Sequence, residues 1–530
     1  VTPFLSIALC QSFPVATFAG CARMLKLTVL GAAAIFSVVL PQQAAGFSAP
    51  TVLSGARGVV HRAHGARCFT PVDCAKRTRR APPLKMVAAN DDIQVGVSDD
   101  VQNVGRGTLM AKGDAVKEVT GKVQGLYDAY PYPPEKVFDG PTVGYNRRWS
   151  WTHANAVIRG EAPASNAIEI LDAGCGTGVT AQYLSHLNPM ATHFNALDLS
   201  EEALKVAKER AEKADLVGAP NNAVFHHMSL YDVAVLDRKY DFINCVGVLH
   251  HLPDPVQGLR ALAEQLKPGG LMHIFVYSAL GRREIMLMQE ALALLQGGET
   301  DFVEGVAMGR EVFKVLPESS RIKTREKERW EMENERDSTF ADMYLHPQEV
   351  DYTVPSLFQW IDTVSDLGIE FAGFSNPKIW DLKRLLGDSP DLLAKAQALP
   401  ERQRYRLAET LDPDTFTHYE FFLSKGPVER TDWAALDDEA FFASEAIRQA
   451  GLAPWPAERV FDESYNLIQL TDAQYELLQK CAQDPTAETV EWGDVEEPRT
   501  LSAMMEEMEA KVTREEVMKL VELEFLFLRK

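Results

Sequence analysis

The chain of 530 residues has few cysteines, no excess of basic residues and no long apolar run. Four of its seven cysteines fall within the first 74 residues, and only Cys175, Cys245 and Cys481 lie in the rest of the chain. Three scattered cysteines are too few for a disulfide framework or a cysteine-ligated zinc site. We therefore expect a reduced protein without a structural metal.

Basic residues are scarce everywhere except at the start of the chain. The formal net charge is −21, yet the stretch up to Met86 holds ten Lys/Arg and one acid, Asp73. The remainder is therefore even more acidic than the whole. A strongly acidic body repels polyanions, and Arg147-Arg148 is too short to form a basic patch. We expect no nucleic acid as partner or acceptor.

The longest apolar run, residues 27–40, has 14 residues and is too short for a typical membrane span. Met24-Leu-Lys gives it a positive start, and small residues follow at 44–46, as in a signal peptide. The basic stretch up to Met86 is typical of a transit peptide. We expect residues 1–86 to be a bipartite targeting leader, for which Met24 offers a start, and no membrane span in the mature chain.

The junction at residues 44–50, Ala-Ala-Gly-Phe-Ser-Ala-Pro, resembles the phenylalanine-centred presequence of algae with secondary, red-derived plastids. This resemblance implies a location in the plastid (chloroplast) stroma. Simple secretion is the alternative.

The most informative stretch is residues 168–178, Ile-Glu-Ile-Leu-Asp-Ala-Gly-Cys-Gly-Thr-Gly. It reads as an apolar strand that ends in an acid and continues into three glycines at alternate positions. Twenty residues beyond Gly178, a second strand ends in Asp198. A strand that runs into a glycine-rich turn lets a ligand approach bare backbone. An acid at the end of the next strand is placed to hold the two hydroxyls of a ribose.

The spacing of these glycines distinguishes between nucleotide ligands. A dinucleotide fingerprint, G-x-G-x-x-G, leaves a helix N-terminus open to a pyrophosphate. Here the glycines are two apart, and Asp172 precedes them. A carboxylate repels a pyrophosphate but attracts a sulfonium or an amino group. The pattern resembles the S-adenosylmethionine loop of class I methyltransferases; an ordinary strand–turn–helix crossover is the alternative.

Strands and helices alternate through the next hundred residues. Ser200 is a helix N-cap, strands are predicted at 224–225, 240–246 and 271–277, and a short helix at 259–266. Alternation of this kind implies a doubly wound parallel α/β sheet that binds its ligand at the carboxyl ends of the strands. The resemblance covers residues 165–280 and implies a Rossmann-like methyltransferase sheet of the seven-stranded type.

Carried over by motif position, the resemblance assigns the cofactor-binding residues. It places the S-adenosylmethionine site at Asp172, Gly174, Cys175, Gly176, Thr177, Gly178, Asp198, Leu199, Ser229, Leu230 and Val246. Ser229 and Leu230 would flank the adenine. Many relatives have an acid where Ser229 stands, but a hydroxyl can still accept a weaker hydrogen bond there.

Catalysis leaves a weaker trace in the sequence. Methyl transfer from a sulfonium mainly requires that the nucleophile be brought into line, and a general base helps only if the acceptor carries a proton. His250 and His251 follow the predicted fourth strand, where such a base is expected. We favour His251, with a structural or substrate-packing role as the alternative for either histidine.

Aromatic residues and prolines crowd the segment before the core. Residues 126–135 and 144–153 contain the pattern "YPYPP…GYNxRW", which resembles a poorly characterised methyltransferase family of bacteria and plastid-bearing organisms. Prolines suppress helix there, so we predict a linker and an aromatic lid over residues 87–160. Its residues Tyr130, Tyr132, Trp149 and His153 would touch cofactor or acceptor; an arm packed on the sheet edge is the alternative.

The chain after the core is predicted to contain two further parts. Residues 281–430 would form an acceptor-pocket insertion and the end of the sheet, with helices at 285–295 and 321–336, a loop at 342–347 and a strand at 415–423. His346 could face the acceptor, although a lone loop histidine is more often structural. Residues 431–530 would be a small, α-rich accessory module (a strand, then three helices, the last over residues 512–528) whose spacing resembles winged-helix modules. Because it is acidic, a protein partner suits it better than DNA.

The sequence thus predicts an S-adenosylmethionine-dependent methyltransferase with its core at residues 161–280 and a small-molecule acceptor. Two alternatives stay open. Some protein-lysine methyltransferases share a Tyr-Pro-rich segment and extra C-terminal domains, and a non-catalytic scaffold that binds the cofactor would carry the same loop. The methylated atom, the acceptor and the oligomeric state are not encoded in any motif that we can identify.

Overall fold

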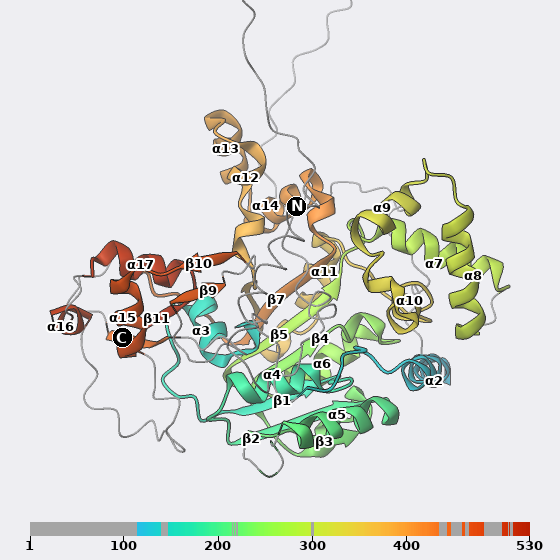
Figure 1. Ribbon diagram of the computed structural model, residues 1–530, viewed down its shortest axis with the longest axis horizontal. Coiled ribbons are helices and arrows are strands. Elements are labelled where there is room, and N and C mark those ends of the chain that lie inside the picture. The colour runs from blue at the N-terminus through green and yellow to red at the C-terminus, as the bar shows by residue number, and fades with distance from the viewer. Residues whose placement is uncertain are drawn as a thin grey trace, which may run out of the picture. The chain divides into compact units, whose positions relative to one another are not determined.

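The computed structural model describes residues 114–138, 147–214, 216, 218, 221–297, 301–433, 442–446, 458–461, 466–481, 501–506, 508 and 512–529 (Figure 1). The targeting leader predicted at residues 1–86 lies outside the described residues, and so does the linker up to residue 113. Among the helices that are described, none combines the length and the apolar character needed to cross a membrane.

The centre of the fold is a seven-stranded sheet in the order β3-β2-β1-β4-β5-β7-β6. The first five strands run parallel, and β7 runs antiparallel to both of its neighbours, β5 and β6. The strands are β1 (Glu169–Ala173), β2 (His193–Asp198), β3 (Val224–His227), β4 (Tyr240–Val246), β5 (Leu266–Tyr277), β6 (Ile369–Phe374) and β7 (His418–Lys425). This is the Rossmann-like methyltransferase sheet that the sequence predicted.

Apolar side chains of the flanking helices cover both faces of this sheet, as expected for parallel strands. One hydrophobic cluster joins Leu171 of β1 to α6 and α11, and the other joins Ile170 to α3, α4 and α5. Two of the connecting helices have side-chain N-caps. Side-chain oxygens of Ser200 and Asp254 accept hydrogen bonds from backbone N–H groups in the first turns of α5 and α6, respectively. The connecting elements are α4 (Val179–Leu187), α5 (Glu201–Lys213), η4 (Leu230–Leu236), η5 (Leu249–His251) and α6 (Pro255–Gln265).

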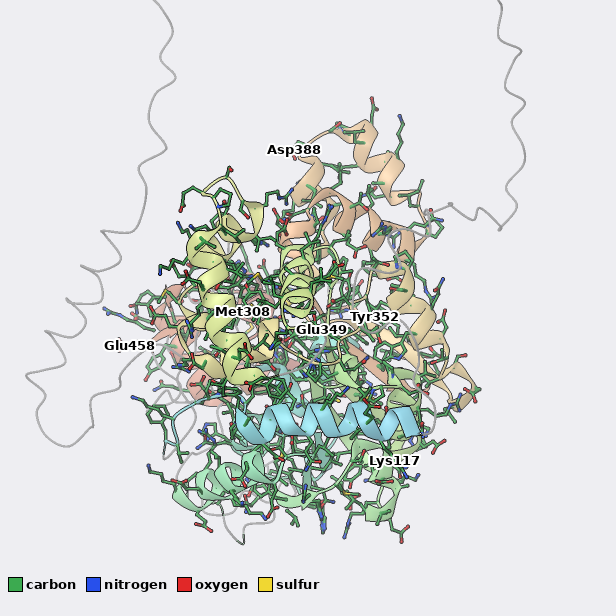
Figure 2. All side chains as sticks on the ribbon, turned by 90° about the vertical axis from the view of Figure 1, so that its right-hand side faces the viewer. Lys117, Met308, Glu349, Tyr352, Asp388 and Glu458 are labelled. Atoms are coloured by element: carbon green, nitrogen blue, oxygen red, sulfur yellow. The ribbon has the colours of Figure 1, made fainter. Side chains whose placement is uncertain are left out.

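Within the described residues, three helical elements precede the sheet: α2 (Asp114–Ala129), η3 (Arg147–Trp149) and α3 (Trp151–Arg159). Figure 2 faces α2 and shows the inserted helices above it. Ser200 Oγ donates to the Asp128 carboxylate at 2.7 Å, so α2 is joined to the start of α5. The N-terminal segment is therefore part of the fold around the sheet.

The insertion between β5 and β6 differs from prediction at two places. The charged helix predicted at 321–336 ends at Arg329, because the buried Glu326 carboxylate accepts hydrogen bonds from Asn334 and Tyr344 and the chain folds back over it. The prediction of a loop at 342–347 is wrong for residues 342–344, which belong to helix α10. Phe340 and Tyr344 of this helix pack into a hydrophobic cluster. The elements are α7 (Arg283–Leu295), α8 (Phe302–Val315), α9 (Arg321–Arg329), η6 (Glu333–Glu335), α10 (Asp337–Tyr344), α11 (Val354–Asp362) and η7 (Ser365–Leu367).

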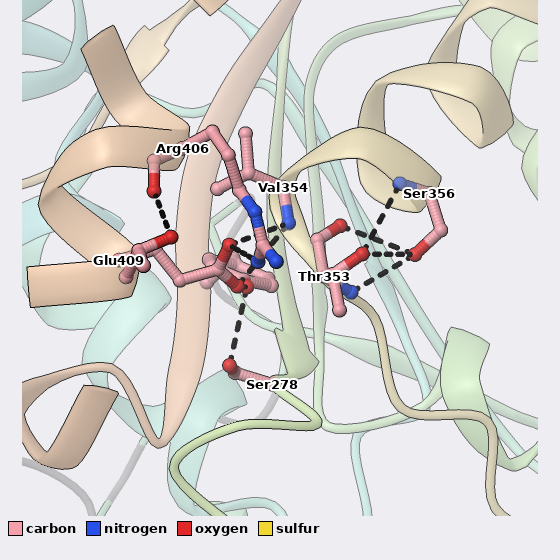
Figure 3. A network of polar contacts seen from close by, with 8 residues as sticks. Ser278, Thr353, Val354, Ser356, Arg406 and Glu409 are labelled. Atoms are coloured by element: carbon pink, nitrogen blue, oxygen red, sulfur yellow. Dashed lines mark hydrogen bonds and ion pairs between the residues drawn. The ribbon is translucent and has the colours of Figure 1, made fainter. Parts of the chain in front are cut away.

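A polar network fastens the end of the insertion to the sheet (Figure 3). The buried Glu409 carboxylate accepts from the Val354 N–H that begins α11 and from the Tyr419 hydroxyl of β7, while Ser278 Oγ donates to the Tyr419 hydroxyl at 3.1 Å. Glu409 belongs to the helical connection between β6 and β7. This connection contains η8 (Pro377–Trp380), α12 (Leu382–Leu386), α13 (Pro390–Gln397), α14 (Glu401–Leu411) and η9 (Pro413–Thr415).

The C-terminal region is helical, but the prediction that its last segment is one helix over 512–528 is wrong. Helix α17 stops at Glu522, Glu524 adopts a left-handed φ of 61°, and the chain turns into β11. The described elements are β8 (Phe442–Ala446), β9 (Arg459–Phe461), β10 (Leu467–Gln469), α15 (Asp472–Cys481), α16 (Leu501–Glu506), α17 (Arg514–Glu522) and β11 (Leu526–Arg529). β11 pairs with β8 and β10 with β9, both antiparallel. The winged-helix likeness stays a prediction.

Candidate functional site

A cavity of about 260 Å³ lies at the carboxyl ends of the parallel strands. Its loop side consists of residues that follow β1, β2, β3 and β4, among them Gly174, Asp198, Ser229 and Val246. Its insertion side is formed by residues beyond β5, among them Tyr277, Arg282, Trp330, Glu333, Asp342 and Met343. One continuous space therefore connects the predicted cofactor residues with the predicted acceptor region.

The glycines of the loop are required by the surrounding chain as well. Gly174 (φ 89°) and Gly176 (φ 51°) have left-handed backbones that favour glycine. A Cβ on Gly174 would lie 2.2 Å from a Val248 methyl, and one on Gly176 would lie 2.3 Å from the Tyr132 carbonyl oxygen. Their missing side chains thus admit neighbouring parts of this protein, and both glycines also line the cavity.

Asp172, the acid that precedes these glycines, has one oxygen unused. Its Oδ1 accepts a hydrogen bond of 2.8 Å from Asn244 Nδ2, whereas the buried Oδ2 has no hydrogen-bond partner. Burial raises the pKa of this carboxyl to about 7; Asn244 lowers the pKa and Asp198 raises it further. A buried carboxylate oxygen without a donor suits a ligand that brings a positive charge or N–H groups.

Asp198 lines the cavity at the end of β2 and also shapes the loop. Its Oδ2 accepts from the Gly176 N–H and its Oδ1 from the Ser200 N–H, both at 2.8 Å. Ser229 lines the cavity as well, and its hydroxyl accepts from the Tyr231 N–H at the start of η4. Each side chain retains acceptor capacity, which fits the ribose and adenine positions predicted for them.

The other predicted cofactor residues divide into two groups. Cys175, Leu199, Leu230 and Val246 line the cavity, whereas Asp172, Thr177 and Gly178 do not. Thr177 instead binds the N-terminal segment: its hydroxyl donates to the Pro133 carbonyl at 2.7 Å and its N–H to the Tyr132 carbonyl at 3.0 Å.

The buried Arg210 reinforces this contact between the loop and the N-terminal segment. Its guanidinium donates to the carbonyl oxygens of Glu135, Lys136 and Thr177 at 2.9–3.1 Å. The predicted lid is therefore held against the loop by hydrogen bonds to its backbone.

Only half of the predicted lid residues reach the cavity. Tyr132 and Trp149 line it. Tyr130 packs instead against the cluster of the inserted helices. His153 lies on α3 with its ring 5.9 Å from that of Phe527 in the C-terminal region, so it faces away from the cavity.

The two histidines after β4 occupy different environments. His251 lines the cavity, and its Nδ1 donates to the Gln348 carbonyl at 2.9 Å, since a carbonyl oxygen can only accept. Burial lowers the pKa of His251 to about 4, so the ring is neutral at pH 7 and its Nε2 carries a free lone pair. His250 lies behind it, fully buried and 4.1 Å from the rings of His251 and Tyr277. Position therefore favours His251.

Arg282, which the sequence did not single out, is the buried cation of the insertion side. Its guanidinium donates to both oxygens of Glu349 at 3.0 and 3.1 Å, lies 3.7 Å from an Asp351 oxygen and stacks 3.4 Å above the Tyr277 ring. Against the cost of burial, Glu349 and these neighbours raise the pKa of Arg282, so the charge is permanent. In the view of Figure 2, Glu349 lies above α2.

Asp342 was also missed, because it stands in a segment predicted to be a loop. The hydroxyl of Tyr127, on α2, donates to Asp342 Oδ1 at 3.0 Å, and burial raises the pKa of this carboxyl to about 7. This hydrogen bond joins the N-terminal segment to the insertion across the cavity. Neither residue has a local sequence signal, since the pair is 215 positions apart.

His251, Asp342 and His346 have donor atoms within 4.8 Å of one another, the spacing of a loose metal site. The two imidazole rings, however, stack with centroids 3.6 Å apart. Rings that bind zinc at about 2.1 Å and at tetrahedral angles have centroids about 5 Å apart. The His346 Nδ1 also accepts from the Gln348 N–H, which leaves the proton of a neutral ring on Nε2. We assign no metal to this group.

Comparison with known proteins agrees with this geometry. The family described as "Methyltransferase domain" matches residues 170–270. An uncharacterized protein of Synechococcus sp. is 49% identical over 364 residues, which cover 68% of this chain and 85% of that protein.

Two further similarities are more limited. A ubiquinone biosynthesis O-methyltransferase of Aromatoleum aromaticum is 28% identical over 171 residues, which cover 30% of this chain and 62% of that enzyme. The solved structure of PKMT2 from Rickettsia typhi aligns with 74% of this chain and 76% of its own at 15% identity and a TM-score of 0.47.

Proposed function

The chain belongs to the same family as the uncharacterized Synechococcus protein and is a class I S-adenosylmethionine-dependent methyltransferase, and we propose that its methyl acceptor is a small molecule. The acceptor would bind on the insertion side of the cavity. The observation that carries this proposal is that one cavity is lined both by Asp198 and the glycine loop and by His251 and Asp342.

Burial supports a small acceptor. His251, Asp342 and Met343 are buried, and the last two belong to the inserted helix α10. A pocket with buried walls and a few polar groups is typical of small-molecule sites. A polypeptide acceptor would have to insert a single side chain end-on into this space.

We further infer that the methylated atom is an oxygen. The Aromatoleum relative is an O-methyltransferase by name, and His251 presents an unprotonated Nε2 to the cavity. S-Adenosylmethionine, when bound, supplies the methyl group on its sulfonium. His251 would accept the hydroxyl proton as the new oxygen–methyl bond forms and the sulfur–methyl bond breaks. Alignment of the hydroxyl by the buried walls would supply most of the acceleration.

The test uses the full-length chain, cell extract and methyl-labelled S-adenosylmethionine. Label should appear in a small-molecule fraction. Label in the protein fraction would instead favour a protein methyltransferase. An absence of transfer despite cofactor binding would favour a scaffold protein. Asp198→Ala is the negative control, because it removes the acceptor of two loop N–H groups.

We also propose that the protein works in the plastid stroma of an alga with a secondary plastid. The proposal rests on the composition of residues 1–86. Residues 1–86 fused to a fluorescent protein should direct it to the plastid in such an alga, and fluorescence in the medium would instead indicate secretion.

A further inference from the structure

A buried line of polar side chains crosses four strands of the sheet beneath the cavity. Asn244 Nδ2 donates to Asp172 Oδ1 at 2.8 Å, Asn244 Oδ1 lies 2.9 Å from His273 Nδ1, and His273 Nε2 lies 3.0 Å from Glu420 Oε1. Asp172, Asn244 and His273 are register neighbours on β1, β4 and β5, and Glu420 is on β7. We call these four residues the relay.

The two ends of the relay lie at functionally different places. Asp172 precedes the glycine loop, and Glu420 lines the cavity. Glu420 also accepts from Ser375 Oγ at 2.6 Å and lies 3.2 Å from Arg148 Nε. Between the ends, Asn244 and His273 are wholly buried. Buried polar chains are costly unless every member is satisfied, so their donors and acceptors must follow a fixed order.

That order determines the charge of His273. If Asn244 donates to an ionised Asp172, its amide oxygen must accept from His273 Nδ1–H. Burial raises the pKa of Glu420, but Arg148 and His273 outweigh this effect and hold the pKa well below its usual range. Glu420 is therefore an ionised carboxylate and accepts a hydrogen bond from His273 Nε2–H. The ring then carries both protons and is a cation. The charged groups around it are Asp172, Glu420 and Arg148.

One other arrangement satisfies every group. If Asp172 is protonated and the Asn244 amide turns by half a rotation, Asp172 donates to the amide oxygen and the amide N–H donates to Nδ1 of a neutral His273. The relay holds the same number of protons in both arrangements, since one proton has moved from His273 to Asp172. The pKa of Asp172, raised to about 7, is consistent with both being accessible near neutral pH.

We propose that Asn244 and His273 are positioning residues that couple the charge at the cofactor loop to the carboxylate of Glu420. A cofactor cation beside Asp172 selects the arrangement in which Asp172 is ionised and His273 is a cation. Glu420 then lies between two cations, His273 and Arg148, and faces the cavity as a fixed acceptor. The relay thereby favours binding of the cofactor before the methyl acceptor. It rests on the proposed function only in that S-adenosylmethionine binds at the loop.

The test is NMR of the full-length chain labelled with ¹⁵N in its histidine rings, at neutral pH. Without cofactor the proton should reside on Asp172 and His273 should be neutral. Saturation with S-adenosylmethionine should convert His273 from a neutral to a doubly protonated pattern. The half-buried His193, at the start of β2, should not change. A His273 that stays neutral, or that is a cation with and without cofactor, would overturn the proposal.

Asn244→Leu removes both hydrogen-bonding groups while nearly preserving the shape. In this variant the affinity for S-adenosylmethionine should fall about tenfold, in line with one lost hydrogen bond to a charged group, and His273 should no longer respond. Asn195→Leu is the matched control: Asn195 is buried on β2 and bonds to Tyr240 and His226, outside the relay. A response of His273 that survives in Asn244→Leu would also contradict the coupling.

The relay and the proposed function fail in different ways. If His273 responds to the cofactor but no label is transferred to any acceptor, the relay stands and the small-molecule acceptor does not. If label is transferred while His273 never changes its protonation, the function stands and the relay is wrong. The measurement on the unmodified chain remains decisive even if Asn244→Leu does not fold.

Discussion

The two sides of the cavity are built in opposite ways. The loop side takes its residues from successive strand ends between Gly174 and Val248, so they come from one continuous stretch of the sequence. The insertion side collects Arg282, Asp342 and Glu420 from three distant segments. The loop side depends on backbone turns and the insertion side on buried charges. The cofactor site can thus be maintained by local backbone geometry, whereas the acceptor pocket depends on long-range packing.

The largest effect is expected from removal of Arg282, the buried cation of the insertion side, and it should appear in the free energy of unfolding. Arg282→Met leaves Glu349 and Asp351 buried without their partner and should lower the free energy of unfolding by about 3–5 kcal/mol. Arg260→Met is the control, because its ion pair with Asp366 is exposed and should contribute little to the free energy of unfolding. Urea denaturation followed by circular dichroism measures both. Equal effects would mean that the charges of the insertion side are not special.

Substitution of His251 should separate the two sides functionally. His251→Gln removes the base but leaves the loop side untouched, so kcat should fall about 100-fold while the affinity for S-adenosylmethionine is unchanged. His193→Gln, at the start of β2, should leave both quantities unchanged, because His193 does not line the cavity. Turnover and calorimetric titration of the cofactor provide the two measurements. A matching loss of cofactor affinity would show that His251 belongs to the loop side instead.

The loop side should reveal itself by its pH dependence. Because burial raises the pKa of Asp172 to about 7, the carboxyl is mostly protonated below that pH and cannot attract a cationic cofactor. In the unmodified chain the proton passes from Asp172 to His273, so the affinity for S-adenosylmethionine should depend only weakly on pH. In Asn244→Leu the proton must leave to solvent, so the affinity should rise with pH, by up to about tenfold per unit below pH 7, and level off above it. Adding Asp172→Asn to that variant should remove this dependence. A flat profile in Asn244→Leu would contradict an ionised Asp172 as the partner.

The smallest expected effect is on the affinity for S-adenosylmethionine and concerns Ser229, at the position predicted to bind the adenine. An Asp at position 229 can cap η4 as Ser229 does, and it offers a charged acceptor that roughly doubles the strength of a hydrogen bond to the adenine amino group. Ser229→Asp should tighten S-adenosylmethionine binding about fivefold. Ser229→Ala should weaken it by a similar factor. Titration calorimetry distinguishes these directions, and no change in either variant would place the adenine elsewhere.

Sequence alone predicted the parts of the fold that depend on local signals. The predicted fourth strand, 240–246, coincides with β4, because an apolar run there is bounded by polar residues and a glycine. Gly174, Gly176 and Asp198 were selected by strand-end position and Ser229 by the family resemblance, and all four line the cavity. Positions at the ends of parallel strands converge in space whatever else surrounds them.

The remaining site residues could not be predicted because their environment is created by distant segments. Arg282 looks like an ordinary surface arginine until Glu349 and Asp351 are brought against it. His153 was grouped with Trp149 by proximity in sequence, but α3 begins between them and turns the histidine toward Phe527. Charge and helical periodicity do not report such burial.

The clasp formed by Arg210 around the carbonyl oxygens of Glu135, Lys136 and Thr177 has a consequence for biosynthesis. On the ribosome, residues 132–136 emerge well before α5, so the segment that covers the loop must wait for Arg210 to be synthesised. The cofactor pocket therefore closes only after the chain has passed that point. A fragment restricted to residues 170–270 would contain the clasping arginine but not the segment that it holds, and its loop would stay open.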